Sequence, residues 1–175
     1  MYLFEKNTEF LEETELVKHY KYNDEFLRPY MVSSCEYDFI FGSPSTQTPF
    51  RYELNYRNFY LVTEGEIKVK LAPPKSTKYL HLEKDYVNME FRTPVNPWNI
   101  QDKYKNDFSK IRCLDSIVKK GQIIYIPAYW WYSIDIGENT SICSFKYRTY
   151  MNTLAIADKL CLQFLQLQNV KPNIL

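Results

Sequence analysis

The chain has 175 residues, enough for one domain with a buried core, and its formal net charge of +1 provides no overall field that favours nucleic acid or a membrane surface. No apolar run reaches the roughly 20 residues of a membrane span, and the acidic N-terminus lacks the apolar core of a signal peptide. Four cysteines without metal-ligand spacing indicate reduced thiols in an intracellular protein, either cytoplasmic or nuclear: Cys35, Cys113, Cys143 and Cys161.

The first half of the chain predicts an arm followed by short strands. Residues 1–36 mix charged and aromatic side chains without clean periodicity, which indicates an irregular arm with one short helix at Glu9–Tyr20. Segments rich in β-branched and aromatic residues then predict strands, bounded by turn residues such as Gly65: Tyr37–Phe41, Thr48–Glu53, Asn58–Glu64 and Glu66–Leu71.

The second half begins with a long excursion. Residues 75–110 carry prolines and many charges, and we expect Trp98 to pin this segment across the edge of a sheet. Four more short strands follow at even spacing, which is typical of a barrel or sandwich: residues 112–118, 122–127, 130–136 and 140–149.

The tail of the chain has a different periodicity. Apolar side chains recur every three or four residues over 152–168, which predicts a helix that Asn152 or Thr153 caps and Pro172 ends. This stripe either covers the domain's own sheet or joins two copies of the chain: Leu154, Ala157, Leu160, Cys161, Phe164 and Leu165. We therefore expect one domain over residues 1–175, with the arm at 1–36, a core at 37–149 that includes the excursion, and a helical tail at 150–175.

Three segments carry motifs in a characteristic order. These motifs are an apolar strand, a turn and Thr-Pro in residues 39–53; an apolar strand, a glycine turn and Pro-Pro in residues 58–74; and Ile-Pro-x-x-Trp-Trp in residues 121–134. In this order they resemble the asparaginyl-hydroxylase-like branch of the JmjC-type cupins, a family of iron and 2-oxoglutarate oxygenases. The resemblance spans residues 37–147 and implies a mainly β fold, the double-stranded β-helix or jelly roll. It also implies four structural positions: Gly65, Pro127, Trp130 and Trp131.

The family's reaction requires two histidines and one carboxylate around iron, with open positions for 2-oxoglutarate and oxygen. The matching positions of this chain are Arg51, Glu53 and Tyr132. Arg51 has no lone pair to donate, and Tyr132 can ligate only as a phenolate, whose unperturbed pKa is about 10. Only Glu53 keeps a carboxylate, so we expect a degenerate triad with no metal and no catalytic residue.

The positions that the resemblance assigns to the cosubstrate are also altered. Thr48 matches a threonine that contacts 2-oxoglutarate in the family. Ile67 stands where the family has a lysine, and the neighbouring Lys68 points to the opposite face of its strand. Ser144 replaces an asparagine. We therefore expect no bound cofactor.

Arg51 and Glu53 share one strand face because they are two residues apart, and three interpretations are open. They form a buried ion pair with each other, to which Tyr132 donates its hydroxyl hydrogen. Alternatively, the face is exposed and the pair is merely solvated. In the third interpretation, Arg51 binds an anionic small molecule in the cavity.

These residues favour a catalytically inactive, cupin-fold pseudoenzyme that serves as a structural or protein-interaction module, in a virus particle or another assembly. We expect a protein partner, with a homodimer through residues 152–168 as one form. Scattered basic residues do not favour nucleic acid. One alternative is a protein hydroxylase that binds Fe(II) and 2-oxoglutarate through atypical ligands, and another is a small-anion-binding cupin.

Overall fold

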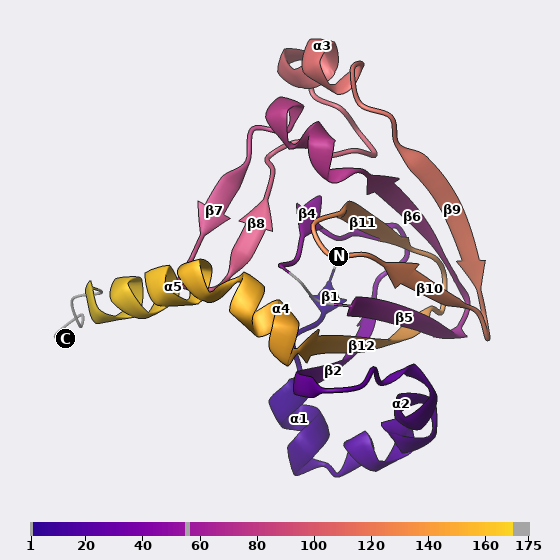
Figure 1. The fold of residues 1–175 in the computed structure, drawn as a ribbon. Coiled ribbons are helices and arrows are strands. Elements are labelled where there is room, and N and C mark those ends of the chain that lie inside the picture. Colours follow the sequence, from indigo (N-terminus) through magenta and orange to yellow (C-terminus); the bar gives the residue numbers. More distant parts are fainter. Residues whose placement is uncertain (1, 55–56, 170–175) are drawn as a thin grey trace, which may run out of the picture.

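The computed structural model describes residues 2–54 and 57–169, and its core is a pair of antiparallel sheets that face each other (Figure 1). The five-stranded sheet has the order β1 (Leu3–Phe4), β2 (Val32–Gly42), β12 (Ser141–Thr149), β5 (Arg57–Glu64) and β10 (Ile123–Ile126). The seven-stranded sheet has the order β7 (Glu83–Asp85), β8 (Glu90–Arg92), β4 (Arg51–Tyr52), β11 (Trp131–Ile136), β6 (Glu66–Ala72) and β9 (Leu114–Lys119), and β3 (Thr46–Gln47) also pairs with β11. The predicted mainly β jelly-roll fold is confirmed.

The predicted strands are present, with shifted ends. β2 begins at Val32, inside the segment predicted as an arm, because it pairs with β12 along most of that strand's length. Of the strand predicted over Thr48–Glu53, only β4 is formed. The side chains alternate as the period of two requires, since Tyr132, Ile134 and Ile136 of β11 enter the core between the sheets.

The space between the sheets is apolar at one end and polar at the other. Ile142 and Lys146 lie on the same face of β12. Ile142 belongs to the apolar core, whereas Lys146 lines a cavity. The alternate residues Cys143, Phe145 and Tyr147 point to the other face and pack against the N-terminal arm. This division of one strand face places charged groups together at a single mouth of the barrel.

The arm is helical where an irregular segment was predicted. It contains α1 (Thr8–Glu13), the 3-10 helix η1 (Leu16–Tyr20) and α2 (Lys21–Leu27), which Figure 1 shows below the five-stranded sheet. The single helix predicted over Glu9–Tyr20 is wrong, because Glu15 has a φ of 59° and breaks it. Burial of Leu11 and Tyr20 against Phe145 stabilises this arrangement, and such tertiary contacts leave no local periodicity.

The excursion is an extension of the seven-stranded sheet. It comprises η2 (Pro74–Tyr79), the hairpin of β7 and β8, η3 (Asp102–Tyr104) and α3 (Lys105–Phe108). β8 pairs with β4 so that Arg92 lies opposite Arg51. Trp98 pins the segment as predicted, because its Nε1 donates a hydrogen bond of 2.8 Å to Ser133 Oγ on β11.

The tail forms two helices, α4 (Tyr150–Ala155) and α5 (Ala157–Asn169), so the single predicted helix is wrong. They separate at Ile156, which is buried against Leu54 and Phe91. The cap of α4 is Thr149, one turn earlier than predicted, and its side chain forms a reciprocal capping box with Asn152. Pro172 lies outside the described residues. None of the helices in the described part of the chain combines the length and the apolar character needed to span a bilayer.

Candidate functional site

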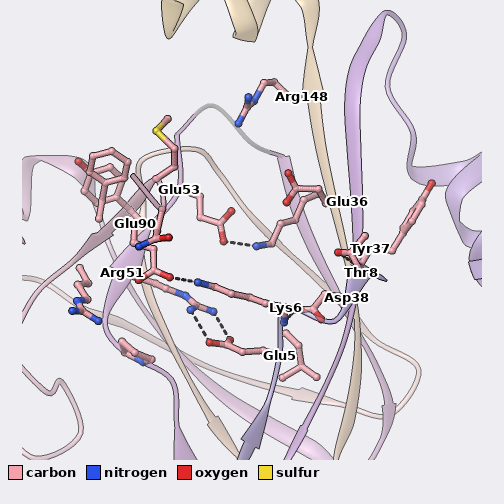
Figure 2. Close-up of a pocket in the computed structure, with 18 of the residues that line it drawn as sticks. Glu5, Lys6, Thr8, Glu36, Tyr37, Asp38, Arg51, Glu53, Glu90 and Arg148 are labelled. Carbon is pink, nitrogen blue, oxygen red and sulfur yellow. Dashed lines mark hydrogen bonds and ion pairs between the residues drawn. The ribbon is translucent and has the colours of Figure 1, made fainter. Parts of the chain in front are cut away.

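A cavity of about 730 Å³ opens at the polar end of the barrel (Figure 2). Its walls come from the N-terminal segment, β2, β4, β5, β8, β12 and α5. The charges of the lining side chains balance, with five acidic and five basic residues: Glu5, Glu36, Asp38, Glu53 and Glu90 against Lys6, Arg51, Arg92, Lys146 and Arg148. A cavity lined in this way has no net preference for a cation or an anion.

The structure brings the three predicted triad positions together. Arg51 lies directly opposite Tyr132 in the pairing of β4 with β11, and its guanidinium carbon is 5.8 Å from the centre of the Tyr132 ring. The Tyr132 hydroxyl donates a hydrogen bond of 2.8 Å to Glu53 Oε1. The Arg51 and Glu53 side chains are only 16% and 17% exposed, which rules out the solvated-face interpretation.

Arg51 and Glu53 do not pair with each other, as one of the three interpretations proposed, because each has another partner. Two guanidinium nitrogens of Arg51 donate to the two carboxylate oxygens of Glu5, at 3.0 and 2.7 Å. Lys146 Nζ donates to Glu53 Oε1 at 2.7 Å. Figure 2 shows both contacts as dashed lines. We name these four residues, Glu5, Arg51, Glu53 and Lys146, the interior charge cluster.

Tyr132 is fully buried and takes part in a chain of hydrogen bonds. Its oxygen accepts a hydrogen bond of 2.9 Å from the Tyr60 hydroxyl while its own hydrogen goes to Glu53. Burial, followed by the negative charge of Glu53, raises the pKa of Tyr132 above its ordinary value. Tyr132 is therefore a neutral phenol at physiological pH.

The members of the interior charge cluster hold one another in their ionised forms. Burial alone would raise the pKa of Glu53, but the charges of Lys146 and Arg51 and the hydrogen bonds from Lys146 and Tyr132 lower it below its ordinary value. Burial alone would lower the pKa of Lys146, but the Glu53 carboxylate, with Tyr132 beside it, raises it instead. At neutral pH the site thus contains two cations and two carboxylates.

The three positions predicted to correspond to a cosubstrate site, Thr48, Ile67 and Ser144, are all buried. Thr48 Oγ1 accepts a hydrogen bond of 2.9 Å from the Ile134 backbone N–H, which ties the segment before β4 to β11. Ile67 is fully buried in the apolar core. Ser144 is fully buried too, and its hydroxyl has no hydrogen-bond partner among the residues that the structure describes.

The positions predicted to be structural lie in turns and cores. Gly65 has a φ of 71°, and a Cβ there would lie 2.3 Å from Thr140 Oγ1, so a side chain does not fit. Trp131 is fully buried on the outer face of the seven-stranded sheet. Trp130 packs against the core between the sheets, and its backbone N–H donates to the Pro127 carbonyl at 3.3 Å.

Sequence reasoning missed Glu5 and Lys146. Lys146 was within reach, because it lies two residues after Ser144 on one strand and so shares its inward face. Glu5 carries no such signal, since it lies in the N-terminal segment, 46 positions before Arg51. Within residues 2–54 and 57–169, no three His, Cys, Asp or Glu side chains gather as a metal site would require.

A family model described as a cupin-like domain matches residues 4–152. Two solved structures of oxalate oxidase, one of them in complex with glycolate, are similar to this chain with 11% sequence identity and a TM-score of 0.41. Each alignment covers 66% of this chain and 42% of the oxalate oxidase chain, so the chain spans less than half the length of those proteins. No curated protein matches.

Proposed function

Because this chain belongs to the cupin-like domain family, we propose that it is a non-catalytic member that acts as a structural or protein-interaction module. The observation that carries this proposal is the interior charge cluster. At the positions where the related oxygenases have their iron ligands, this chain has a guanidinium, a neutral phenol and a carboxylate already bonded to an ammonium group. The function of the domain then does not depend on metal chemistry at these positions.

This set of side chains does not fit Fe(II). Arg51 and Tyr132 offer no lone pair of the required kind, and Glu53 Oε1 already accepts hydrogen bonds from Tyr132 and Lys146. A metal ion at Glu53 would compete with the Lys146 ammonium for the carboxylate and would lie beside Arg51. Separating a buried ion pair costs about 3–5 kcal/mol, in addition to the repulsion between cations.

Anaerobic titration of the purified protein with Fe(II) and 2-oxoglutarate tests this proposal. We expect neither a visible charge-transfer band nor stoichiometric iron from a folded sample, because the donor set is incomplete. A band with one iron per chain would contradict the proposal and favour the hydroxylase with atypical ligands.

A matched variant checks the placement of the triad. It carries Arg51→His, Glu53→Asp and Tyr132→His, together with Lys146→Asn to remove the competing ammonium group. Iron uptake by this variant alone is the expected result, since the three positions already lie side by side. A folded variant that takes up no iron would mean that these positions do not correspond to the ligands of the oxygenases.

The proposed partner is a second copy of the chain, bound through residues 152–168. α5 runs out from the sheets past the hairpin of β7 and β8 (Figure 1). Several large apolar side chains of α4 and α5 are more than half exposed: Met151, Leu154, Phe164, Leu165 and Leu167. Residues 160–168 contain no charged side chain, so two identical faces meet without like-charge repulsion.

The double substitution Phe164→Glu and Leu165→Glu should convert such a dimer into a monomer. Charges on both copies would then have to be buried without partners. Sedimentation velocity over a range of concentrations measures the change. The control is Tyr22→Glu with Phe26→Glu, which alters two exposed apolar side chains on α2 and should leave the dimer intact. A wild-type protein that is monomeric at every concentration would contradict the dimer while leaving the non-catalytic assignment in place.

A further inference from the structure

We infer that the barrel cavity is a binding site for a small monocarboxylate, and that the Glu5 side chain occupies this site from within the same chain. Arg51 lines the cavity and presents two N–H groups in parallel to the Glu5 carboxylate, at 3.0 and 2.7 Å. This two-fold contact is the geometry by which arginine recognises carboxylates in ligands. Figure 2 shows Glu5 entering from the N-terminal segment to meet Arg51.

Glu5 differs from the other members of the interior charge cluster in how it is held. Arg51 and Lys146 lie on strands of the two sheets, and Glu53 follows β4 directly. Glu5 follows β1, a strand of two residues that pairs only with the end of β2 among the described strands. The barrel thus supplies the receptor for a carboxylate, and the segment between β1 and α1 supplies the carboxylate.

The backbone beside Glu5 is both strained and hydrogen-bonded. Lys6 has a φ of 61°, a left-handed conformation that is costly for a residue with a side chain. It is held by backbone N–H groups of Lys6 and Asn7, which donate to the Asp38 carboxylate at 2.8 and 3.0 Å. Withdrawal of the segment would relax this strain, which partly offsets the loss of these hydrogen bonds.

The size and charge of the cavity indicate the class of ligand. Its volume of about 730 Å³ is within the usual range for small-molecule sites, and Tyr52, Met89 and Phe91 provide an apolar wall. Five acidic and five basic side chains line the cavity with Glu5 in place. Exchange of Glu5 for one external carboxylate keeps that balance, whereas a dicarboxylate such as 2-oxoglutarate would add an uncompensated charge.

The test removes Glu5 and supplies its carboxylate as acetate. In the Glu5→Ala variant, Arg51 is left buried without its partner, so the melting temperature should fall below that of the wild type. Sodium acetate should then raise the melting temperature in a saturable way, relative to sodium chloride of equal ionic strength. At ten times its dissociation constant, the expected rise is about 3–6 °C. The wild type should not respond, because the tethered Glu5 competes at high effective concentration.

Two controls separate this effect from general salt stabilisation. Glu90→Ala removes another carboxylate that lines the same cavity, the partner of Lys6, and should leave the response to acetate as weak as in the wild type. Adding Arg51→Met to Glu5→Ala should abolish the response. An equal response of Glu5→Ala and Glu90→Ala to acetate, or a response that survives Arg51→Met, would overturn the inference.

The inference stays testable if Glu5→Ala does not fold in chloride. Refolding in acetate is then the measurement, and recovery of the native circular dichroism only in acetate would support the site. Failure in both salts would overturn it. The result is independent of the iron titration, since a carboxylate site is compatible with either outcome for metal binding.

Discussion

Replacing Lys146 with methionine should lower the free energy of unfolding by about 3 kcal/mol at neutral pH, because Glu53 then remains buried without its cation. We expect the lower end of the usual range because the Lys146 and Glu53 side chains are not fully buried. They are 16% and 17% exposed. Urea denaturation measures the loss. The double variant Lys146→Met with Glu53→Leu should regain most of it, because no unpaired charge is left behind.

The same variant should change how stability depends on pH. In the wild type, the pKa of Glu53 is lowered on folding, so its stabilisation is present above the unfolded pKa of about 4.3 and is lost as the pH falls through the lower folded value. Without the charge and the hydrogen bond of Lys146, the pKa of Glu53 should be higher than in the wild type, so the destabilisation is largest at neutral pH and shrinks as Glu53 takes up a proton. A loss below about 0.5 kcal/mol at neutral pH, typical of an exposed pair, would contradict the structure.

Replacing Trp131 with alanine should cost about 3–5 kcal/mol of unfolding free energy. The ring is fully buried, with its centre 4.9 Å from the Tyr52 ring and 5.6 Å from the Phe50 ring. Its Nε1 also donates a hydrogen bond of 2.9 Å to Thr77 Oγ1 in the excursion. Removing the indole therefore leaves a large cavity and releases the segment that covers it.

Trp130→Ala is the matched control for this measurement. Trp130 has the same side chain in the neighbouring position, but it is only partly buried against the core between the sheets. Its loss should therefore cost clearly less than the loss of Trp131. Chemical denaturation of both variants gives the comparison, and equal costs would mean that the two rings are buried to a similar extent.

The strand positions were predictable because their signal is local. Polar and apolar side chains alternate on β6 as the prediction requires, and the chain order of motifs leads to the two facing sheets. The helices were harder to predict from the sequence. α1 and α2 depend on contacts with β12, and Ile156 interrupts the tail because it is buried against Leu54 and Phe91. No window of neighbouring residues contains such contacts.

The candidate site also contains features that were predictable from the sequence and features that were not. From the sequence by itself, the resemblance predicted that Arg51, Glu53 and Tyr132 lie together, with Tyr132 as a hydrogen-bond donor, and the structure brings the three together. The tertiary structure decided which charges pair. Lys146 lies 93 positions after Glu53 and Glu5 lies 46 positions before Arg51, so only the closed barrel brings them within hydrogen-bonding distance. Each buried charge needs a partner at about 3 Å, and sequence separation does not predict which residue provides it.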